Sequence, residues 1–441
     1  MRSSHSLDRV DTAFDDDRLV PDAGLILPAT LAHHLGLKAL VDEHLDLGRK
    51  PGGANLGDKL LTLVMSALAG GDHIDHANAL RAGGTGRVLG FTVKAASTLG
   101  TFLRSFTWGH VRQLDAVSRE LLARAWAAGA GPDDGSLTID LDSTICETYG
   151  LAKQGALHHG YTGVRGYHPL LAVAAGTGDV LMARLREGRA HSGRSAGHFL
   201  RETVSRVRHA GATGQLTMRA DSGFYAHAVV ATCRTLKVRF SITVRQHKGL
   251  RALIEAIPEH AWRPIPYWIE GGADVAETVY TPFADQKGAA PVRLIVRCVR
   301  PTPGSQLALF ALYDYHAFIT DRVGDTLTLE ADHRRHAEVE NAIRDLKEGV
   351  GLNHLPSGRF AANGAWLAVV VMAHNVARWT ARIGLGEGIV TTRTLRRRLF
   401  GLPGRLTRSA RRVTLHLPAR WPWAADFGTA LTRFRAIPLL T

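Results

Sequence analysis

The sequence predicts an α/β protein whose strands lie between a helical N-terminal part and a basic C-terminal part. Up to about residue 130, apolar residues recur every three to four positions, which is typical of helices. From Gly135 apolar and polar residues alternate, which is typical of strands with one buried face. Between residues 247 and 330, short alternating runs are separated by turns that contain Pro or Gly, which favours a β-rich insertion.

The first 131 residues are expected to form a helical domain. Helical spacing covers residues 30–45, 56–68 and 116–128, with Gly-rich turns between them. A further helix is expected to begin near Ser97 or Thr98, because either hydroxyl can cap its first turn.

The first strand of the predicted core carries two carboxylates. Leu137, Ile139 and Leu141 alternate with polar residues, so Asp140 and Asp142 lie on the opposite face. Asp142 stands at the C-terminal end of this strand. Asp140 either supports Asp142 or is a polar residue on an exposed face, and the pattern leaves both interpretations open.

Two strands, a helix, a strand, a helix and a fifth strand follow in that order. They are expected at residues 168–175, 180–186, 193–210, 215–220, 224–236 and 238–244. This order is that of the ribonuclease-H-like fold, in which the first and fourth strands lie side by side. Because the fourth strand ends at Asp221, Asp142 and Asp221 are expected to be neighbours.

The insertion is expected to contain strands at residues 276–281, 292–299 and 307–312. Helices return near Asp332, and residues 360–383 form the most apolar helix of the chain before a basic tail. We therefore expect a ribonuclease-H-like core interrupted by the insertion. The domains are predicted at residues 1–131, 132–246, 247–330, 331–385 and 386–441.

Glu340 lies on one stripe of its predicted helix together with Lys347, His336 and His333, given 100° of rotation per residue. An ordinary solvated helix with Glu–Arg pairs is the alternative. If the fold brings Asp142, Asp221 and Glu340 together, their mutual repulsion requires a divalent cation. Mg²⁺ suits such a site, and two ions about 3.5–4 Å apart would promote in-line attack on a phosphodiester.

Composition favours a polyanionic partner and a cytoplasmic location. The chain has 441 residues, 54 basic and 40 acidic side chains, and a net charge of +14. Its three cysteines are too few for a disulfide framework. The N-terminus lacks the apolar region of a signal peptide, and the longest apolar run, residues 366–373, is far short of the roughly 20 needed to span a bilayer. No membrane partner is expected.

The chain resembles bacterial insertion-sequence transposases of the DDE class, specifically the transposase DDE domain group 1 family. The resemblance rests on the ordered segments IDLDST, GYHPLLAV, RADSGF, ENAIRDLKEGVGLNHLPSGRF and FAANGAWLAVVVMAHNVARW. It implies that Asp142, Asp221 and Glu340 are catalytic and bind two Mg²⁺ ions, for which Mn²⁺ can substitute. It also implies a homodimer that binds double-stranded DNA at terminal inverted repeats and joins the 3′ ends to target DNA.

Related transposases carry Tyr seven positions and Arg four positions before the last Glu, and Lys seven positions after it. Lys347 fits this signature, whereas His333 and His336 occupy the Tyr and Arg positions. Either the two imidazoles contact phosphate, or Arg334, Arg335 and Arg344 supply the missing charge. A zinc site at His158 and His159, or at His333 and His336, is disfavoured because no further ligand has matching spacing.

Other residues are expected to bind DNA, at phosphates through basic groups or at an unpaired base through an aromatic ring. A solvated basic face and core packing are the respective alternatives. The full set of predicted DNA-binding residues is Lys347, His336, His333, Arg344, Arg335, Arg396, Arg397, Arg398, Trp268 and Trp262.

Two other functions compete with a transposase. A stand-alone metal-dependent nuclease of the same fold would cut DNA without joining it, and a non-catalytic transposase-derived protein would only bind DNA. The presence of all three carboxylates argues against the second, and the helical, inserted and basic segments argue against a minimal nuclease. The predicted enzyme is therefore a DNA transposase in the bacterial cytoplasm, associated with the nucleoid when bound to DNA.

Overall fold

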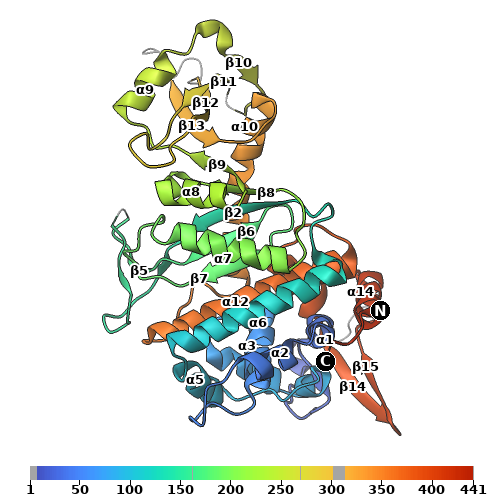
Figure 1. Cartoon of the computed structure of the whole chain (residues 1–441). Helices are drawn as coiled ribbons and strands as arrows, with labels where there is room; N and C mark the ends of the chain where they lie inside the picture. Colours follow the sequence, from blue (N-terminus) through green and yellow to red (C-terminus); the bar gives the residue numbers. More distant parts are fainter. Residues whose placement is uncertain (1–6, 161, 269, 301–312, 441) are drawn as a thin grey trace.

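The computed structural model describes residues 7–160, 162–268, 270–300 and 313–440, so the strand predicted at 307–312 lies outside the described residues. A nine-stranded mixed sheet in the order β10-β11-β12-β13-β9-β8-β2-β6-β7 forms the centre of the molecule (Figure 1). Its strands are β2 Leu137–Ser143, β6 Leu170–Ala174, β7 Val180–Arg184, β8 Leu216–Ala220, β9 Arg239–Thr243, β10 Arg263–Ile265, β11 Ala273–Tyr280, β12 Val292–Val299 and β13 Asp314–Thr320.

The five strands predicted for the core are all present. β6 is antiparallel to β2 and to β7, whereas β8 runs parallel to both β2 and β9. The predicted adjacency of the first and fourth strands is confirmed, since Leu141 of β2 pairs with Ala220 of β8. Helices α7 (Ala196–His209) and α8 (His227–Thr235) contact each other and lie against this part of the sheet (Figure 1).

The strands of the predicted insertion extend the same sheet. β13 pairs antiparallel with β9, and β12, β11 and β10 follow outward in antiparallel order. The strand predicted at 292–299 has those bounds, whereas the one predicted at 276–281 begins earlier, at Ala273. The inserted strands therefore lie at the end of the molecule far from the N-terminal helices (Figure 1). Helix α9 (Lys248–Glu255) precedes them.

The N-terminal part is helical, but its helix bounds differ from the predicted ones. Its helices are α1 Ile26–His34, α2 Leu37–His44, α3 Leu56–Ala69, α4 Thr85–Val88, α5 Ala96–Arg104 and α6 Trp108–Ala125. The single helix predicted at 30–45 is wrong, because Gly36 adopts a left-handed conformation (φ 69°) and separates α1 from α2. Neither Ser97 nor Thr98 caps α5, which follows Ala95. Helix α6 begins eight residues earlier than predicted, at a Thr107 capping box.

The most apolar helix crosses the middle of the structure. α12 (Phe360–Trp379) continues as a π-helical turn to Leu385 and contacts α3, α6 and β7. Residues Phe360–Leu385 are long and apolar enough to cross a membrane, but 83% of the most apolar window is buried inside the fold. These contacts identify α12 as a core helix of this structure.

The C-terminal segments return to the N-terminal helices. After α13 (Thr392–Leu395), the hairpin of β14 (Gly404–Ser409) and β15 (Arg412–His416) projects from the body and pairs with β1 (Leu19–Val20) (Figure 1). Helix α14 (Ala424–Ala436) packs against α1. A small sheet of β3 (Cys146–Glu147), β5 (Arg165–Tyr167) and β4 (Leu157–His158) completes the described strands.

Candidate active site

Asp142 and Asp221 stand at the same end of neighbouring strands. The pairing of Leu141 with Ala220 makes Asp142 and Asp221 the next positions along two parallel strands, which run about 4.8 Å apart. The Asp142 carboxylate accepts a hydrogen bond from the Ser143 backbone N–H at 2.6 Å. Asp221 caps a short 3₁₀ turn by accepting from the Gly223 N–H at 2.9 Å. Both side chains are therefore fixed by their own backbone at the edge of the sheet.

Glu340 comes from a later segment of the chain and lies near the C-terminal end of β2. It lies on α11 (Val339–Arg344), within a series of helical turns that runs from α10 (Thr326–Arg334) through the 3₁₀ turn Arg335–Glu338 to the π-turn Asp345–Gly349. An open cavity of about 450 Å³ is lined by Asp142, Glu340, Arg344 and Lys347, among others. The predicted stripe of Glu340 and Lys347 thus faces the end of β2.

The environment of Asp142 disfavours its charged form. Burial is the main cause that raises the pKa of Asp142 to about 6, and the negative charges of Asp221 and Glu340 act in the same direction, whereas the Ser143 N–H and the charge of His336 oppose them. A carboxyl group held in this environment is stabilised in its charged form by a cation. Asp142 and Glu340 line the open cavity, and Asp221 stands beside Asp142 at the edge of the sheet. This donor set fits Mg²⁺, which prefers one or two carboxylates together with water and phosphate oxygens.

Asp140 and Arg219, which stand two residues before Asp142 and Asp221, form a buried ion pair. Asp140 and Arg219 are directly paired across β2 and β8, and their side chains are 2% and 1% exposed. The guanidinium donates to both carboxylate oxygens at 2.8 Å, and to the Asp332 backbone carbonyl at 2.5 Å. This pair fixes the register that aligns Asp142 with Asp221. The alternation in the sequence did not single out Arg219, although its position two residues before Asp221 in RADSGF was a usable signal.

Asp140 also orients His336. Its Oδ1 lies 2.9 Å from Nδ1 of His336, so of the two interpretations of Asp140 the exposed strand face is wrong. His336 and Glu340 both line a second cavity, of about 310 Å³, which shares Glu340 with the first. Lys347 donates to the Ile145 backbone carbonyl at 3.0 Å, just beyond the end of β2. These two side chains bracket Glu340 along the predicted stripe.

His333 does not fit the predicted phosphate contact. Its ring stacks on Phe318 with a centroid distance of 4.0 Å, and its nitrogens lie 2.7 Å from the Ser241 hydroxyl and 3.0 Å from the Thr243 hydroxyl. Burial, followed by the positive charges of His336 and Arg219, lowers the pKa of His333 well below 6.5. A neutral ring with both nitrogens already hydrogen-bonded has no charge to offer a phosphate.

Two of the three consecutive arginines are also engaged within the fold. Arg396 donates to the Leu68 carbonyl at 2.8 Å and to the Gly349 carbonyl at 2.5 Å, and Arg398 pairs with Glu387 and Asp426. Of these three arginines, Arg397 is the one that is exposed, so the predicted basic face is reduced to Arg397. Carbonyls at the C-terminal end of a helix have no donor within the helix and therefore attract such arginines. A sequence pattern cannot reveal these contacts between distant segments.

Two predicted arginines, Arg335 and Arg344, lie in the same series of helical turns as Glu340. Arg335 forms an ion pair with Glu338 at 2.9 Å. Arg344 is exposed and has no ion-pair partner among the residues that the structure describes. Arg344 and Lys347 are thus the predicted cations that line the cavity of Asp142 and Glu340.

The two predicted aromatic residues differ sharply in exposure. Trp262 is partly buried, lies 6.0 Å from the Tyr315 ring between centroids, and packs against the main core. Trp268 is 83% exposed at the turn before β11. Core packing therefore accounts for Trp262 but not for Trp268.

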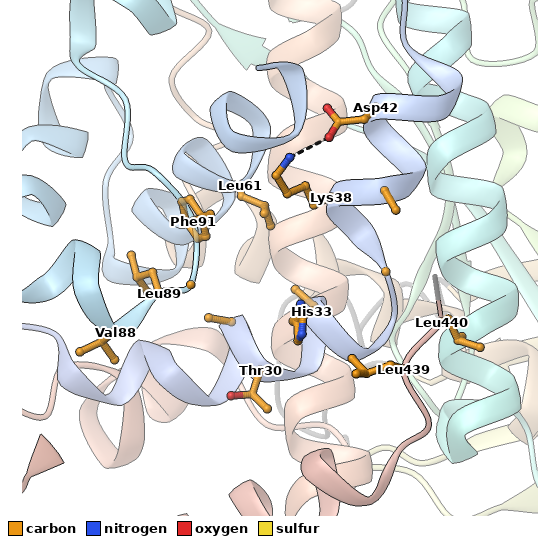
Figure 2. A pocket seen from close by; sticks show the side chains of 15 residues that line it. Thr30, His33, Lys38, Asp42, Leu61, Val88, Leu89, Phe91, Leu439 and Leu440 are labelled. Carbon is orange, nitrogen blue, oxygen red and sulfur yellow. Dashed lines mark hydrogen bonds and ion pairs between the residues drawn. The ribbon is translucent and has the colours of Figure 1, made fainter. Parts of the chain in front are cut away.

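A further cavity, of about 690 Å³, lies among the N-terminal helices (Figure 2). Its wall is mostly apolar and includes Leu61, Phe91 and Leu440, with Lys38 hydrogen-bonded to Asp42 at 2.8 Å near its rim (Figure 2). None of the predicted catalytic or DNA-binding residues lines it. The carboxylate site and this cavity are therefore separate features of the molecule.

His168, which precedes β6, provides a prediction about pH. Burial lowers its pKa to about 4, with the charge of Arg186 acting in the same direction. In the unfolded chain this imidazole is protonated near pH 6.5, whereas in the folded chain it is protonated only near pH 4. We expect the stabilisation by neutral His168 to be complete above pH 6.5. The free energy of unfolding should fall by about 3 kcal/mol as the pH drops to 4.

His168→Asn keeps a donor toward the Ala190 carbonyl, which the ring nitrogen contacts at 2.6 Å, and removes the titration. Urea unfolding in EDTA between pH 4 and 6.5 should give a flatter dependence on pH for this variant. His198→Asn, at an exposed imidazole, is the control. An unchanged slope in His168→Asn would contradict the assignment.

Comparison with known proteins gives three findings. A family model described as transposase DDE domain group 1 matches residues 3–439. No curated protein matches the chain. Among solved structures, a piggyBac transposase synaptic complex with hairpin DNA, determined by cryo-electron microscopy, matches at 12% identity over 87% of this chain and 80% of that chain, with a TM-score of 0.45.

Proposed function

The chain belongs to the transposase DDE domain group 1 family, and from that premise we propose that it is the transposase of an insertion sequence. It binds the terminal inverted repeats of its element, cleaves the DNA there, and joins the 3′ ends to target DNA. The observation that carries the proposal is that Asp142 and Asp221 stand at the same end of two adjacent strands, and that the charges of Asp221 and Glu340 both raise the pKa of Asp142.

The strand order supports a ribonuclease-H-like core. Three antiparallel strands, β7, β6 and β2, followed by parallel β8 and β9, reproduce the order expected from the sequence. We propose that residues 132–246 and 331–385 form this core and that 247–330 is the insertion. The helical residues 1–131 would bind DNA ends, and residues 386–441 would form a basic C-terminal region.

The carboxylates would hold two Mg²⁺ ions, which activate the attacking oxygen and stabilise the leaving oxygen of the phosphodiester when they are bound. The chain's own residues prepare this site. Arg344 and Lys347 present positive charge along the cavity of Asp142 and Glu340, which suits contacts to the phosphate backbone. His336, held by Asp140, presents an oriented imidazole beside Glu340.

Two DNA ends must be brought together before joining, and a second copy of the chain is the natural way to do so. We therefore propose a homodimer in the complex with DNA. The net charge of +14 favours such a polyanionic partner. The same chemistry suits a cytoplasmic protein that associates with the nucleoid through DNA.

One assay separates the proposed function from its alternatives. Purified protein is mixed with Mg²⁺, a linear DNA that carries the candidate terminal repeats, and a target plasmid. Joined products are expected, and their absence would overturn the proposal. Cleavage without joining would favour a stand-alone nuclease, and a mobility shift without cleavage would favour a non-catalytic DNA-binding protein.

Trp268 is the residue that we expect to stack on an unpaired base beside the cleavage point. Because its side chain is 83% exposed, Trp268→Ala should change the free energy of unfolding by less than about 0.5 kcal/mol. A stacked base contributes about 1–3 kcal/mol, so cleavage should slow by about 5- to 150-fold. Rates are measured by single-turnover cleavage of end-labelled DNA.

Trp268→Phe should recover most of that rate, because any aromatic face can stack. Trp262→Ala is the matched comparison and should lose stability, since Trp262 packs on the core. If Trp268→Ala cleaves at the rate of the unchanged protein, base stacking at this position is excluded.

A further inference from the structure

A group of metal-binding side chains lies outside the carboxylate site. Asp72 and His73 occupy the turn after α3, and His76 follows in the 3₁₀ helix Ile74–Arg81. One ligand atom from each of these three side chains lies within 4.8 Å of the others. Nδ1 of His73 is 2.5 Å from the Asp72 carboxylate, and Nδ1 of His76 is 3.2 Å from it. Nitrogen and oxygen donors thus converge on one point.

A fourth candidate ligand comes from a distant part of the chain. The ring of His354 lies 3.7 Å from the ring of His73, between centroids. The loop that carries it begins just after the π-turn that ends at Gly349 and contains Lys347. The two loops are in close contact, because a Cβ added at Gly351 would lie 2.8 Å from the Asp72 Cβ. Asp72 and His354 are therefore held together by the fold.

We propose that Asp72, His73 and His76 bind a transition-metal ion of the Zn²⁺ class, with His354 as the fourth ligand. Three imidazoles and one carboxylate make a tetrahedral set that Zn²⁺ accepts at about 2.0–2.2 Å. Three of the four donors already converge, and the His354 ring must turn from its contact with the His73 ring to add the fourth. Mg²⁺ and Ca²⁺ take oxygen ligands and are poor competitors for this set.

The position of the site suggests what the ion does. It joins the end of α3 to the loop that follows the Glu340 helix. Arg396 spans the same junction, because it donates to the carbonyls of Leu68 and Gly349. A bound ion would therefore fix the C-terminal end of the Glu340 helix against the N-terminal helices. This role is structural and does not depend on the proposed transposase activity.

The donors are accessible, and they differ in chemistry from the three catalytic carboxylates. The side chains of Asp72, His73 and His76 are 43%, 44% and 54% exposed. An ion from solution can therefore reach them without opening of the fold. The sequence carried a signal for the site, the D-H-x-x-H pattern at residues 72–76, which a search for cysteine-based zinc patterns passes over.

Binding is tested on untagged protein that carries Asp142→Asn and Asp221→Asn, so that the catalytic carboxylates do not compete. Zn²⁺ is titrated by calorimetry in the presence of millimolar Mg²⁺, and Co²⁺ is used as a visible-absorption probe of tetrahedral coordination. We expect one Zn²⁺ per chain with a dissociation constant in the micromolar range or below. The melting temperature should rise with Zn²⁺ and not with Mg²⁺.

His76→Ala is the decisive variant, because its half-exposed side chain can be removed without disturbing the core. It should weaken Zn²⁺ binding by about 100-fold, and His354→Ala should weaken it and abolish the tetrahedral Co²⁺ spectrum. His44→Ala removes an imidazole that lies beside Glu43, outside the proposed site, and is the control, with unchanged binding expected. The absence of Zn²⁺ binding, or equal binding in His76→Ala, would overturn the proposal.

Discussion

Replacement of Asp142 or Asp221 by Asn, or of Glu340 by Gln, is expected to reduce DNA cleavage and joining by about 1,000-fold or more while leaving DNA-end binding intact. Each amide keeps the shape of the side chain but removes a charge that the proposed metal ions would need. A loss of this size corresponds to about 4 kcal/mol of transition-state stabilisation. Cleavage and strand transfer are measured at saturating Mg²⁺, and end binding is measured by mobility shift.

Glu338→Gln is the matched control on the same helix. Glu338 pairs with Arg335 two positions from Glu340, and this variant should cleave normally. If any one of the three carboxylate variants kept full activity, that residue would not belong to the catalytic set. A loss of end binding along with cleavage would indicate a folding defect instead.

The Asp142 variant carries a second expectation that involves stability. Because burial and two neighbouring carboxylates raise the pKa of Asp142 to about 6, its ionised form destabilises the metal-free fold at pH 8. Asp142→Asn should therefore raise the free energy of unfolding in EDTA by about 1–2 kcal/mol. Most of the gain should be lost by pH 4, where the carboxyl group is protonated in the folded state and partly protonated in the unfolded state. Urea unfolding at pH 8 and pH 4 checks this.

Arg219→Met is expected to lower the free energy of unfolding by about 3–5 kcal/mol, because it leaves the Asp140 carboxylate buried without its guanidinium partner. The pair lies between β2 and β8, so the loss should also disturb the alignment of Asp142 with Asp221 and reduce cleavage. Urea denaturation and the cleavage assay measure the two effects.

A double variant separates the loss of the pair from the loss of burial. Asp140→Leu together with Arg219→Met replaces both charges by apolar groups and should be more stable than Arg219→Met alone. Arg239→Met breaks a partly exposed pair with Asp321, the residue that follows β13, and should cost about 1 kcal/mol or less. A double variant as unstable as Arg219→Met would contradict an uncompensated charge as the cause.

The core strands and the adjacency of Asp142 and Asp221 were predictable because they depend on local alternation and on the order of elements. The pairing of Asp140 with Arg219 was not, because alternation assigns a residue to a face without saying what covers that face. On the polar face of β2, Asp140 is buried, whereas Thr138 and Asp142 are partly exposed. The break at Gly36 was missed for a similar reason, since spacing alone cannot distinguish one helix from two.

Residues that depend on distant segments were the hardest to predict. The His333 ring contacts Phe318, Ser241 and Thr243. These residues lie on strands, and the helical spacing around His333 gives no information about them. Arg396 is drawn to carbonyls at the end of α3, far away in the sequence. For His333 the local pattern correctly gave a helix, and for Arg396 it gave a basic segment. In both cases the tertiary contact decided what the side chain does.

The packing of α14 against α1 bears on how the protein is made. Leu440 donates its backbone N–H to the His34 carbonyl at 3.2 Å, and β14 pairs with β1, so the first helices are completed by segments that are synthesised much later. Packing of the N-terminal part is therefore completed only after these later segments have been made. A messenger cut short after α12 would yield a polypeptide whose first helix keeps an uncovered apolar side, open to proteases and chaperones.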